Sequence, residues 1–259
     1  MAAWQKLKFF YETMLGSPGS TLTATSTASG YDVKNIYNML EVDMWLAADA
    51  TSPCYITYDA GTGNTGSADY LAILGHNLGT IGATVVLQYS NDGFTADIND
   101  AFAPEAVTAD TVYLREFTNP GPKRYWRLKI SGAAAPPNLT VCIWGGKTEL
   151  DYATASFDPH GQEVKASVNL SQGGYLTGVH KKYTERQMTL TFHDADSDLY
   201  GKVKTWWETS GLKNFFVAWE RANSPGDAFL MRPDVKFSNP LKQGGLYRDI
   251  TINLAGRKE

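Results

Sequence analysis

Cysteine is scarce in this sequence. Only Cys54 and Cys142 occur among its 259 residues, far apart from each other. Neither belongs to a CxxC pair, so the common zinc and redox motifs are excluded. Two small buried thiols are the favoured interpretation, and a disulfide between them remains an open alternative.

An excess of basic residues and a long apolar run are also missing. The formal net charge is -4, and the adjacent basic residues at 123–124 and 181–182 are pairs rather than patches. We therefore expect no nucleic-acid partner, because phosphate binding needs clustered Lys and Arg. No run approaches the roughly 18 apolar residues of a spanning helix, so no membrane span is expected. No secretory signal is visible at the N-terminus, which predicts synthesis as a soluble chain in the cytoplasm.

Catalytic and metal-binding motifs are missing too. The four histidines form no HExxH pair, and there is no GxSxG, P-loop or dinucleotide-binding glycine pattern. Asp92, Asp97, Asn99 and Asp100 could offer oxygens to Ca²⁺, but their spacing does not match an EF-hand loop. The sequence predicts no enzyme activity, no cofactor and no metal site.

The most informative stretch that is present covers residues 70–90. It contains two apolar runs rich in β-branched and aromatic residues, joined by the glycine-rich turn Gly75-His76-Asn77-Leu78-Gly79. Such runs bounded by Gly and Asn are strand signals. Because the apolar residues are nearly continuous, both strands are expected to be covered on both faces, at the centre of a β-sandwich.

Further strands are expected on both sides of this centre. Residues 53–60, 111–117, 124–131 and 139–144 alternate or are rich in strand formers, and residues 21–29 are an edge strand or a linker. Residues 35–45 are expected to form a turn or short helix that places Trp45 against the sheet. About six short strands without a long helix predict an all-β sandwich or barrel over residues 1–150.

A second β-domain is expected over residues 151–259. Its strands are predicted at 164–170, 183–192, 214–220, 228–237 and 246–254. One helix is predicted over 197–210, capped by Asp196 or Ser197 and ended by Gly211. Its apolar stripe is Leu199, Val203, Trp206 and Trp207, which should face the second core.

Few residues are candidates for ligand binding. Trp45 and the loop tyrosines Tyr31 and Tyr37 are the aromatics that the expected core does not require, and aromatics on β-sandwiches often stack on sugar rings. His76 and Asn77 complete the candidate set, although a structural role in their turn is the favoured interpretation for His76.

The N-terminal half resembles the galactose-binding-like (discoidin-type) jelly roll. The resemblance covers residues 22–146 and rests on Trp45, the strand ending Tyr58-Asp59-Ala60-Gly61, the turn Gly75-His76-Asn77-Leu78 and the late Trp126-Arg127-Leu128. It implies binding of glycans, lipids or proteins without catalysis, through loops at one end.

The C-terminal half resembles the tail-tube-type β-domain of tailed-bacteriophage distal tail and baseplate proteins. The resemblance rests on residues 171–175, 186–192, 215–220 and 250–256 and on the helix with Trp206-Trp207. It implies a ring-shaped homo-oligomer in the virion tail, bound to other tail proteins. The main functional hypothesis is a structural tail-tip or baseplate protein whose jelly roll docks other proteins or a host surface glycan. The alternative is a carbohydrate-binding protein that acts alone through its jelly roll.

Overall fold

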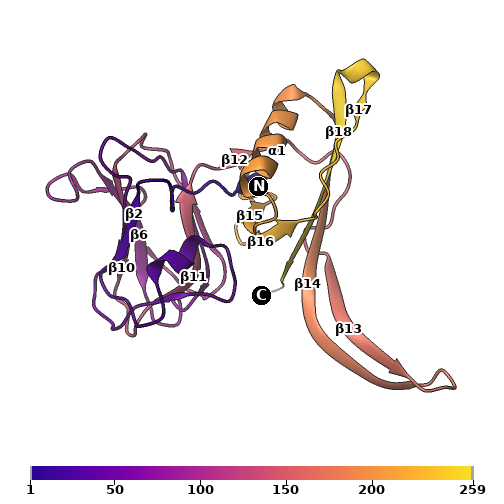
Figure 1. Ribbon diagram of the computed structural model, residues 1–259, viewed down its shortest axis with the longest axis horizontal. Helices are drawn as coiled ribbons and strands as arrows, with labels where there is room; N and C mark the ends of the chain where they lie inside the picture. The colour runs from indigo at the N-terminus through magenta and orange to yellow at the C-terminus, as the bar shows by residue number, and fades with distance from the viewer. Residues whose placement is uncertain (1, 258–259) are drawn as a thin grey trace. The chain divides into compact units, whose positions relative to one another are not determined.

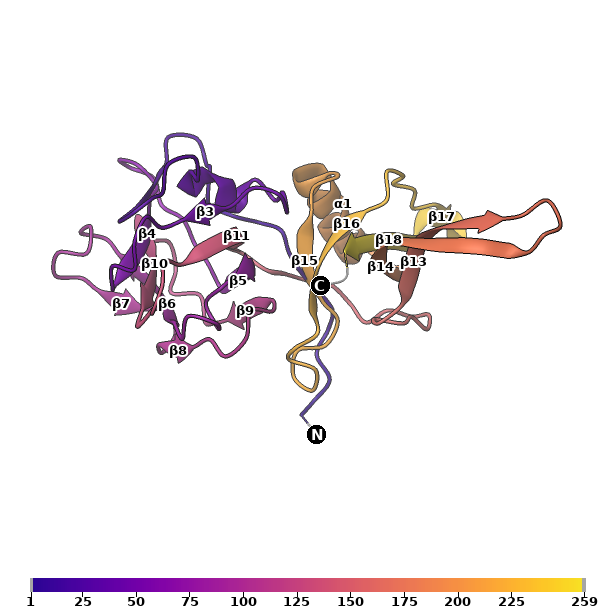
Figure 2. The ribbon, with the colours of Figure 1, turned by 90° about the horizontal axis from the view of Figure 1, so that it is seen from below.

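Residues 10–148 fold as a sandwich of two antiparallel β-sheets in the computed structural model, which describes residues 2–257. Figure 2 shows these two layers. The first sheet has the order β2-β4-β10-β6-β7, with β8 paired to β6. Its strands are β2 (Thr21–Ala24), β4 (Cys54–Asp59), β6 (Thr84–Ser90), β7 (Asn99–Asp100), β8 (Glu105–Ala106) and β10 (Tyr125–Ser131). The second sheet has the order β3-β11-β5-β9, with β3 (Trp45–Leu46), β5 (Tyr70–His76), β9 (Tyr113–Glu116) and β11 (Asn138–Gly145).

The two strands of the glycine-rich stretch lie in opposite sheets. β6 pairs with β10 in the first sheet, and β5 pairs with β11 in the second. Both are covered on both faces, as their continuous apolar character predicts. Leu71 and Ile73 of β5 point into the core between the sheets, while Tyr70 on its other face packs on Phe10 at a ring separation of 5.0 Å. The Tyr70 hydroxyl also donates to the Glu12 carbonyl at 2.6 Å.

The core of this sandwich contains three fully buried tryptophans, Trp45, Trp126 and Trp144. Trp126 and Trp144 lie in β10 and β11, which are strands that the sequence predicts. A short 3₁₀ helix, η1 (Val33–Tyr37), precedes Trp45 and buries Val33 and Ile36. Cys54 and Cys142 are buried free thiols, so the alternative of a disulfide between them is wrong.

The second unit contains residues 2–9 and 149–257 and is built on one large sheet. The sheet order is β12-β1-β15-β16-β18-β14-β13, with β17 paired to β18. Its strands are β1 (Lys8–Phe10), β12 (Thr148–Glu149), β13 (Gln162–Leu170), β14 (Leu176–Ala195), β15 (Phe215–Ala218), β16 (Ala228–Pro233), β17 (Leu241–Lys242) and β18 (Tyr247–Arg257). A 3₁₀ turn, η2 (Gln243–Gly245), joins β17 to β18.

Helix α1 (Ser197–Ser210) packs on this sheet, with the predicted bounds and caps. The Asp196 side chain accepts from the Leu199 N–H at 2.9 Å, and Gly211 ends the helix. Leu199, Val203 and Trp206 are buried as the stripe predicts. Trp207 is half-buried and stacks on Phe237, with ring centroids 5.0 Å apart.

The expected domain boundary needs correction at the N-terminus. Residues 2–9 were assigned to the sandwich, but they belong to the second unit, and the return to that unit falls at residue 149. The reason is aromatic packing over long sequence separation. Phe9 contacts Trp206 and Phe215, with ring separations of 5.0 and 4.8 Å, and Trp4 lies 5.9 Å from Trp219.

The β13–β14 hairpin is longer than expected. β14 begins at Leu176 rather than near residue 183, and a tight turn over residues 171–175 joins it to β13. Figure 1 shows this hairpin extending beyond the part of the sheet that α1 covers. We refer to residues 162–184 as the arm. No helix within residues 2–257 is both long and apolar enough to cross a membrane.

Candidate functional site

A hollow beside Tyr31 is a concave surface that contains one of the predicted ligand residues. Its volume is about 500 Å³, and it is lined by residues 27–33. Tyr31 is 40% exposed there. An exposed ring beside hydroxyl and carboxylate side chains is a chemistry suited to a sugar, which presents both a C–H face and hydroxyls.

Trp45 does not line this hollow but contacts one of its lining residues. Its ring is 0% exposed and packs in the sandwich core. The indole N–H donates to the Thr27 hydroxyl at 3.1 Å, and Thr27 is one of the lining residues. Trp45 therefore has no ring surface open to a ligand, because the core needs it.

Tyr37 also lies outside the lining of the hollow. It ends η1, is half-buried, and packs against the core cluster. Its ring sits so close to Gly16 that a Cβ added there would lie 2.7 Å from Cε2 of Tyr37. The structure thus gives Tyr37 a packing role beside a glycine.

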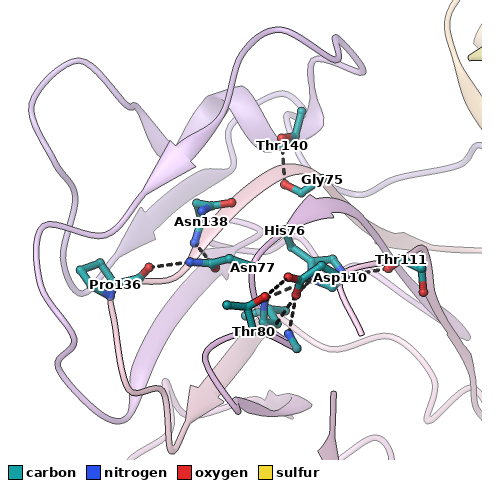
Figure 3. Close-up of polar contacts among 11 residues, drawn as sticks. Gly75, His76, Asn77, Thr80, Asp110, Thr111, Pro136, Asn138 and Thr140 are labelled. Carbon is teal, nitrogen blue, oxygen red and sulfur yellow. Dashed lines mark hydrogen bonds and ion pairs between the residues drawn. The ribbon is translucent and has the colours of Figure 1, made fainter. Parts of the chain in front are cut away.

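His76 holds a loop in place by hydrogen bonds, as Figure 3 shows. Its Nε2 lies 2.8 Å from the Thr111 carbonyl oxygen, which can only accept, so Nε2 carries the proton. Nδ1 accepts from the Leu78 N–H at 3.2 Å. Burial lowers the pKa of His76, while the Thr111 carbonyl and then Asp110 act in the opposite direction.

Asp110 also joins the loop that follows His76 to the loop that precedes Thr111. Its carboxylate accepts from the backbone N–H groups of Gly79 and Thr80 at 2.7 and 3.0 Å, and from the Thr80 hydroxyl at 2.5 Å. The hydrogen bond from Thr80 is the first cause of the lowered pKa of Asp110. Since all these contacts of His76 and Asp110 are with other residues of the protein, His76 has the structural role favoured for its turn.

Asn77 is used in the same internal way. Its side-chain amide donates to the Pro136 carbonyl at 3.0 Å and accepts from the Asn138 N–H at 3.0 Å. It thereby fixes the start of β11 against the turn after β5. Of the five predicted ligand residues, the structure leaves only Tyr31 on an open concave surface.

A polar groove of about 550 Å³ lies on the sheet of the second unit. Its most buried ionisable group is Glu185, which is 6% exposed. The Glu185 carboxylate pairs with Arg232 at 3.0 Å and with Lys165 at 3.2 Å. Two cations already neutralise this carboxylate, so the groove is a polar sheet surface held by ion pairs.

The arm presents an apolar surface that lies outside the predicted ligand residues. Its exposed apolar side chains are Val164, Val168, Leu170, Tyr175, Leu176, Val179 and Tyr183. The available signal was the alternation of Val164, Ala166, Val168 and Leu170, which predicts one covered face. Among residues 2–257, nothing covers that face.

The described residues contain no group of three or more His, Cys, Asp or Glu side chains arranged to hold a metal ion. The loop around Asp92 uses its carboxylate internally instead. Asp92 accepts from the backbone N–H groups of Thr95, Ala96 and Asp97 at 3.1, 2.8 and 2.9 Å.

No family model and no curated protein matches the sequence. Solved structures similar to the chain include carbohydrate-binding modules. Chitosan-binding module 1 of a chitosanase/glucanase from Paenibacillus sp. IK-5 is 19% identical, with a TM-score of 0.39, over 49% of this chain and 96% of that module. The protein CpGH89CBM32-6 of Clostridium perfringens is 12% identical, with a TM-score of 0.40, over 51% of this chain and 98% of its own.

A third similar structure is a GH29 fucosidase of Ruminococcus gnavus in complex with fucose. It is 15% identical, with a TM-score of 0.45, over 54% of this chain and 28% of the fucosidase. The match therefore spans less than a third of that enzyme. Identities and TM-scores this low carry no argument about what the present chain binds, and none of the three is a virion protein.

Proposed function

We propose that this protein is a non-catalytic assembly component, of the kind found in the tip or baseplate of a phage tail, whose arm packs on a second copy of the chain. The uncovered apolar face of the arm is the observation that carries the proposal. We also propose that its sandwich belongs to the galactose-binding-like family.

The arm's apolar face continues the core face of the sheet. The pairing of β13 with β14 has two register shifts, and both place the extra residue on β14. β13 therefore keeps its alternation, so Gln162, Val164, Val168 and Leu170 share one face. Gln162 pairs with Arg186, and alternation along β14 then places Met188, Leu190 and Phe192 on that same face. These three residues are at most 2% exposed, whereas Val164 and Val168 are 54% and 58% exposed.

The residues across the hairpin extend this face. Val179 lies opposite Val168, and Leu176 lies opposite Leu170. A two-stranded hairpin without a covered face is marginally stable in water. An exposed apolar face of this kind marks a surface that associates with another protein.

Charge complementarity favours a second copy as the occupant. The arm contains Lys165, Lys181 and Lys182 and one acidic residue, Glu163, so its net charge is positive. The rest of the chain then holds 20 of the 23 Lys and Arg against 26 of the 27 Asp and Glu. A basic arm on a neighbour with an acidic surface forms a head-to-tail contact, and such contacts close into rings when the rotation allows.

Light scattering coupled to size exclusion tests the proposal on the full chain. Wild-type protein is expected to run as one discrete oligomer, and the double variant Val168→Asp/Val179→Asp as a monomer. Ser167 and His180 form the next register pair, on the opposite face. Ser167→Asp/His180→Asp is therefore the matched control, and it should remain oligomeric. A wild-type chain that is monomeric at tens of micromolar, or a control that dissociates equally, contradicts the proposal.

The Tyr31 hollow supports a second candidate, carbohydrate binding by the sandwich. The observation that supports this candidate is the exposed Tyr31 ring over a hollow of about 500 Å³. A glycan array probed with wild-type protein and Tyr31→Ala tests it. Ile98→Ala, at a 48% exposed position of the same unit, is the control. Binding that survives Tyr31→Ala rules out this site.

A further inference from the structure

The outer face of the first sheet carries a row of polar side chains centred on Arg127. β10 alternates, so Arg127 points away from the core that buries Trp126 and Leu128. In the register of the sheet, Arg127 lies beside Thr57 of β4 and Gln88 of β6. This face is not part of the Tyr31 hollow or of the arm.

Two aromatic rings hold the Arg127 guanidinium. Its Cζ lies 4.2 Å from the centroid of the Tyr55 ring and 4.0 Å from that of the Phe94 ring. Cation–π contacts at these distances fix the plane of the guanidinium and remove water from its faces. Its N–H groups at the edge of that plane remain the polar part of the side chain.

A relay of hydrogen bonds fixes one edge of the guanidinium. Arg127 Nε donates to Gln88 Oε1 at 2.8 Å, and Gln88 Nε2 donates to Asp100 Oδ1 at 2.7 Å. Because the Asp100 carboxylate only accepts, it holds the amide nitrogen of Gln88 toward itself and the oxygen toward Arg127. Gln88 is only 5% exposed, so this relay is a built part of the sheet surface.

Arg127 has no carboxylate of its own. Arg124 pairs with Asp59 at 2.9 Å and Arg232 with Glu185 at 3.0 Å, but Arg127 forms no ion pair with any residue between 2 and 257. Its four other N–H donors have no hydrogen-bond partner in that range. Burial lowers the pKa of this half-buried guanidinium, against smaller contributions from Tyr55 and Asp100. A partly desolvated cation without a counter-charge is a costly arrangement.

The loop that places Phe94 is strained and pinned. Phe94 has a φ of 64°, which a bulky residue rarely adopts. The Ser90 hydroxyl accepts from the Phe94 N–H at 3.0 Å and donates to Asp92 at 2.8 Å, while Asp92 holds the next three amides. Strain of this kind persists only where surrounding contacts enforce it, and it gathers at binding sites.

We propose that Arg127, with the Tyr55 and Phe94 rings on its guanidinium, binds the carboxylate of a small acidic ligand such as a uronic acid. A planar guanidinium matches a carboxylate through two parallel N–H···O bonds. Lys129 lies two residues along on the same face and adds positive charge. Asp100 does not fill the role of the ligand carboxylate, because its own carboxylate accepts from Gln88 and the Gln88 side chain links it to the guanidinium.

Calorimetric titration of the full chain with sodium glucuronate, glucose and sodium acetate tests this site. Glucuronate is expected to bind and glucose is not, because only the former has a carboxylate. If acetate also binds, the carboxylate is sufficient for binding. If glucuronate binds and acetate does not, the sugar ring is needed as well. Either result agrees with the proposal. Equal binding of glucose, or no binding of glucuronate, overturns it.

Variants locate the binding. Arg127→Gln should weaken the affinity for glucuronate by about tenfold to a hundredfold, the usual loss for a charge-assisted pair. The affinity of Arg127→Lys should lie between those of Arg127→Gln and wild type. Lys129→Gln removes the same charge from the same strand and should cost much less. Unaltered affinity in Arg127→Gln overturns the assignment.

A second design keeps the fold and blocks the site. Gln88→Glu/Asp100→Asn moves one negative charge along the relay and preserves both hydrogen bonds. The new Glu would pair with Arg127 and take the place of the ligand carboxylate. Glucuronate binding should be lost while the thermal unfolding midpoint stays within a few degrees of wild type. Retained binding would contradict the proposal even if Arg127→Gln does not fold.

Discussion

The ring of Phe9 lies 5.0 Å from the ring of Trp206, although 197 positions separate them in the sequence. Both side chains are at most 1% exposed, and Phe215 completes the cluster at 4.8 Å from Phe9. An N-terminal strand thus supplies part of the core beneath α1. The next residue, Phe10, packs instead on Tyr70 of the sandwich.

Phe9→Ala should therefore destabilise the unit that contains α1. Truncating a buried phenylalanine costs about 3–5 kcal/mol. Hydrogen exchange followed by mass spectrometry should show faster exchange in peptides covering residues 199–218, with little change in residues 70–90. Phe10→Ala is the matched control and should show the reverse pattern. Equal loss of protection in both regions for both variants would contradict the assignment of Phe9 and Phe10 to different units.

Gly201→Ala should stabilise the same unit. Gly201 lies inside α1, and a Cβ built there meets nothing within 4 Å. Replacing a helical glycine by alanine in open space gains about 0.5–1 kcal/mol, because the unfolded chain loses freedom. Denaturant unfolding monitored by circular dichroism measures the gain.

Gly256→Ala is the contrasting substitution in that unit. A Cβ there would lie against the Leu230 carbonyl oxygen, which belongs to the backbone and cannot rotate away. It should lower stability where Gly201→Ala raises it. A rise in stability for both would mean that the contact at Gly256 relaxes freely.

Local patterns of the sequence predicted the elements that depend on neighbouring residues. The bounds of α1 were correct because Asp196, Gly211 and the stripe from Leu199 to Trp206 are signals within one helix. The alternation of residues 54–59 likewise gave the buried and exposed faces of β4.

Non-local partners could not be read from the sequence. His76 and Asn77 were candidates for ligand binding, yet their partners are backbone groups of Thr111, Pro136 and Asn138, 35 to 61 positions away. The alternation around Val168 is typical of a strand with one covered face, but no pattern states whether an element remains to cover it. The association of residues 2–9 with the second unit depends in the same way on Trp206 and Phe215.

Acidification should destabilise the sandwich through His76. Its pKa in the folded chain is below the ordinary 6.5, mainly because of burial, so the unfolded chain binds the proton more tightly. Stability is therefore fully present above about pH 6.5 and falls as the pH drops toward the folded pKa. Protonated Nδ1 would also face the Leu78 N–H, which is a donor.

Denaturant midpoints measured between pH 7.5 and 5 test this prediction, since most carboxylates titrate lower. His76→Gln should flatten the pH dependence of the sandwich transition over that range. His193→Gln, at an exposed position of the other unit, is the control and should leave that dependence unchanged. A sandwich equally stable at pH 7.5 and 5.5 would show that His76 does not control it.

Asp92→Ala should release the loop that carries Phe94 without unfolding the sandwich. The Asp92 carboxylate accepts three consecutive backbone N–H groups and the Ser90 hydroxyl, and the bond from Asp97 is the first cause of its strongly lowered pKa. Amide exchange at residues 94–97 should accelerate at least tenfold, because three donors lose their acceptor. Asp49→Ala removes a loop carboxylate that holds the Thr51 N–H, and serves as the control with exchange at 94–97 unchanged. Unchanged exchange in Asp92→Ala would mean that Ser90 and the Phe94–Arg127 contact hold the loop by themselves.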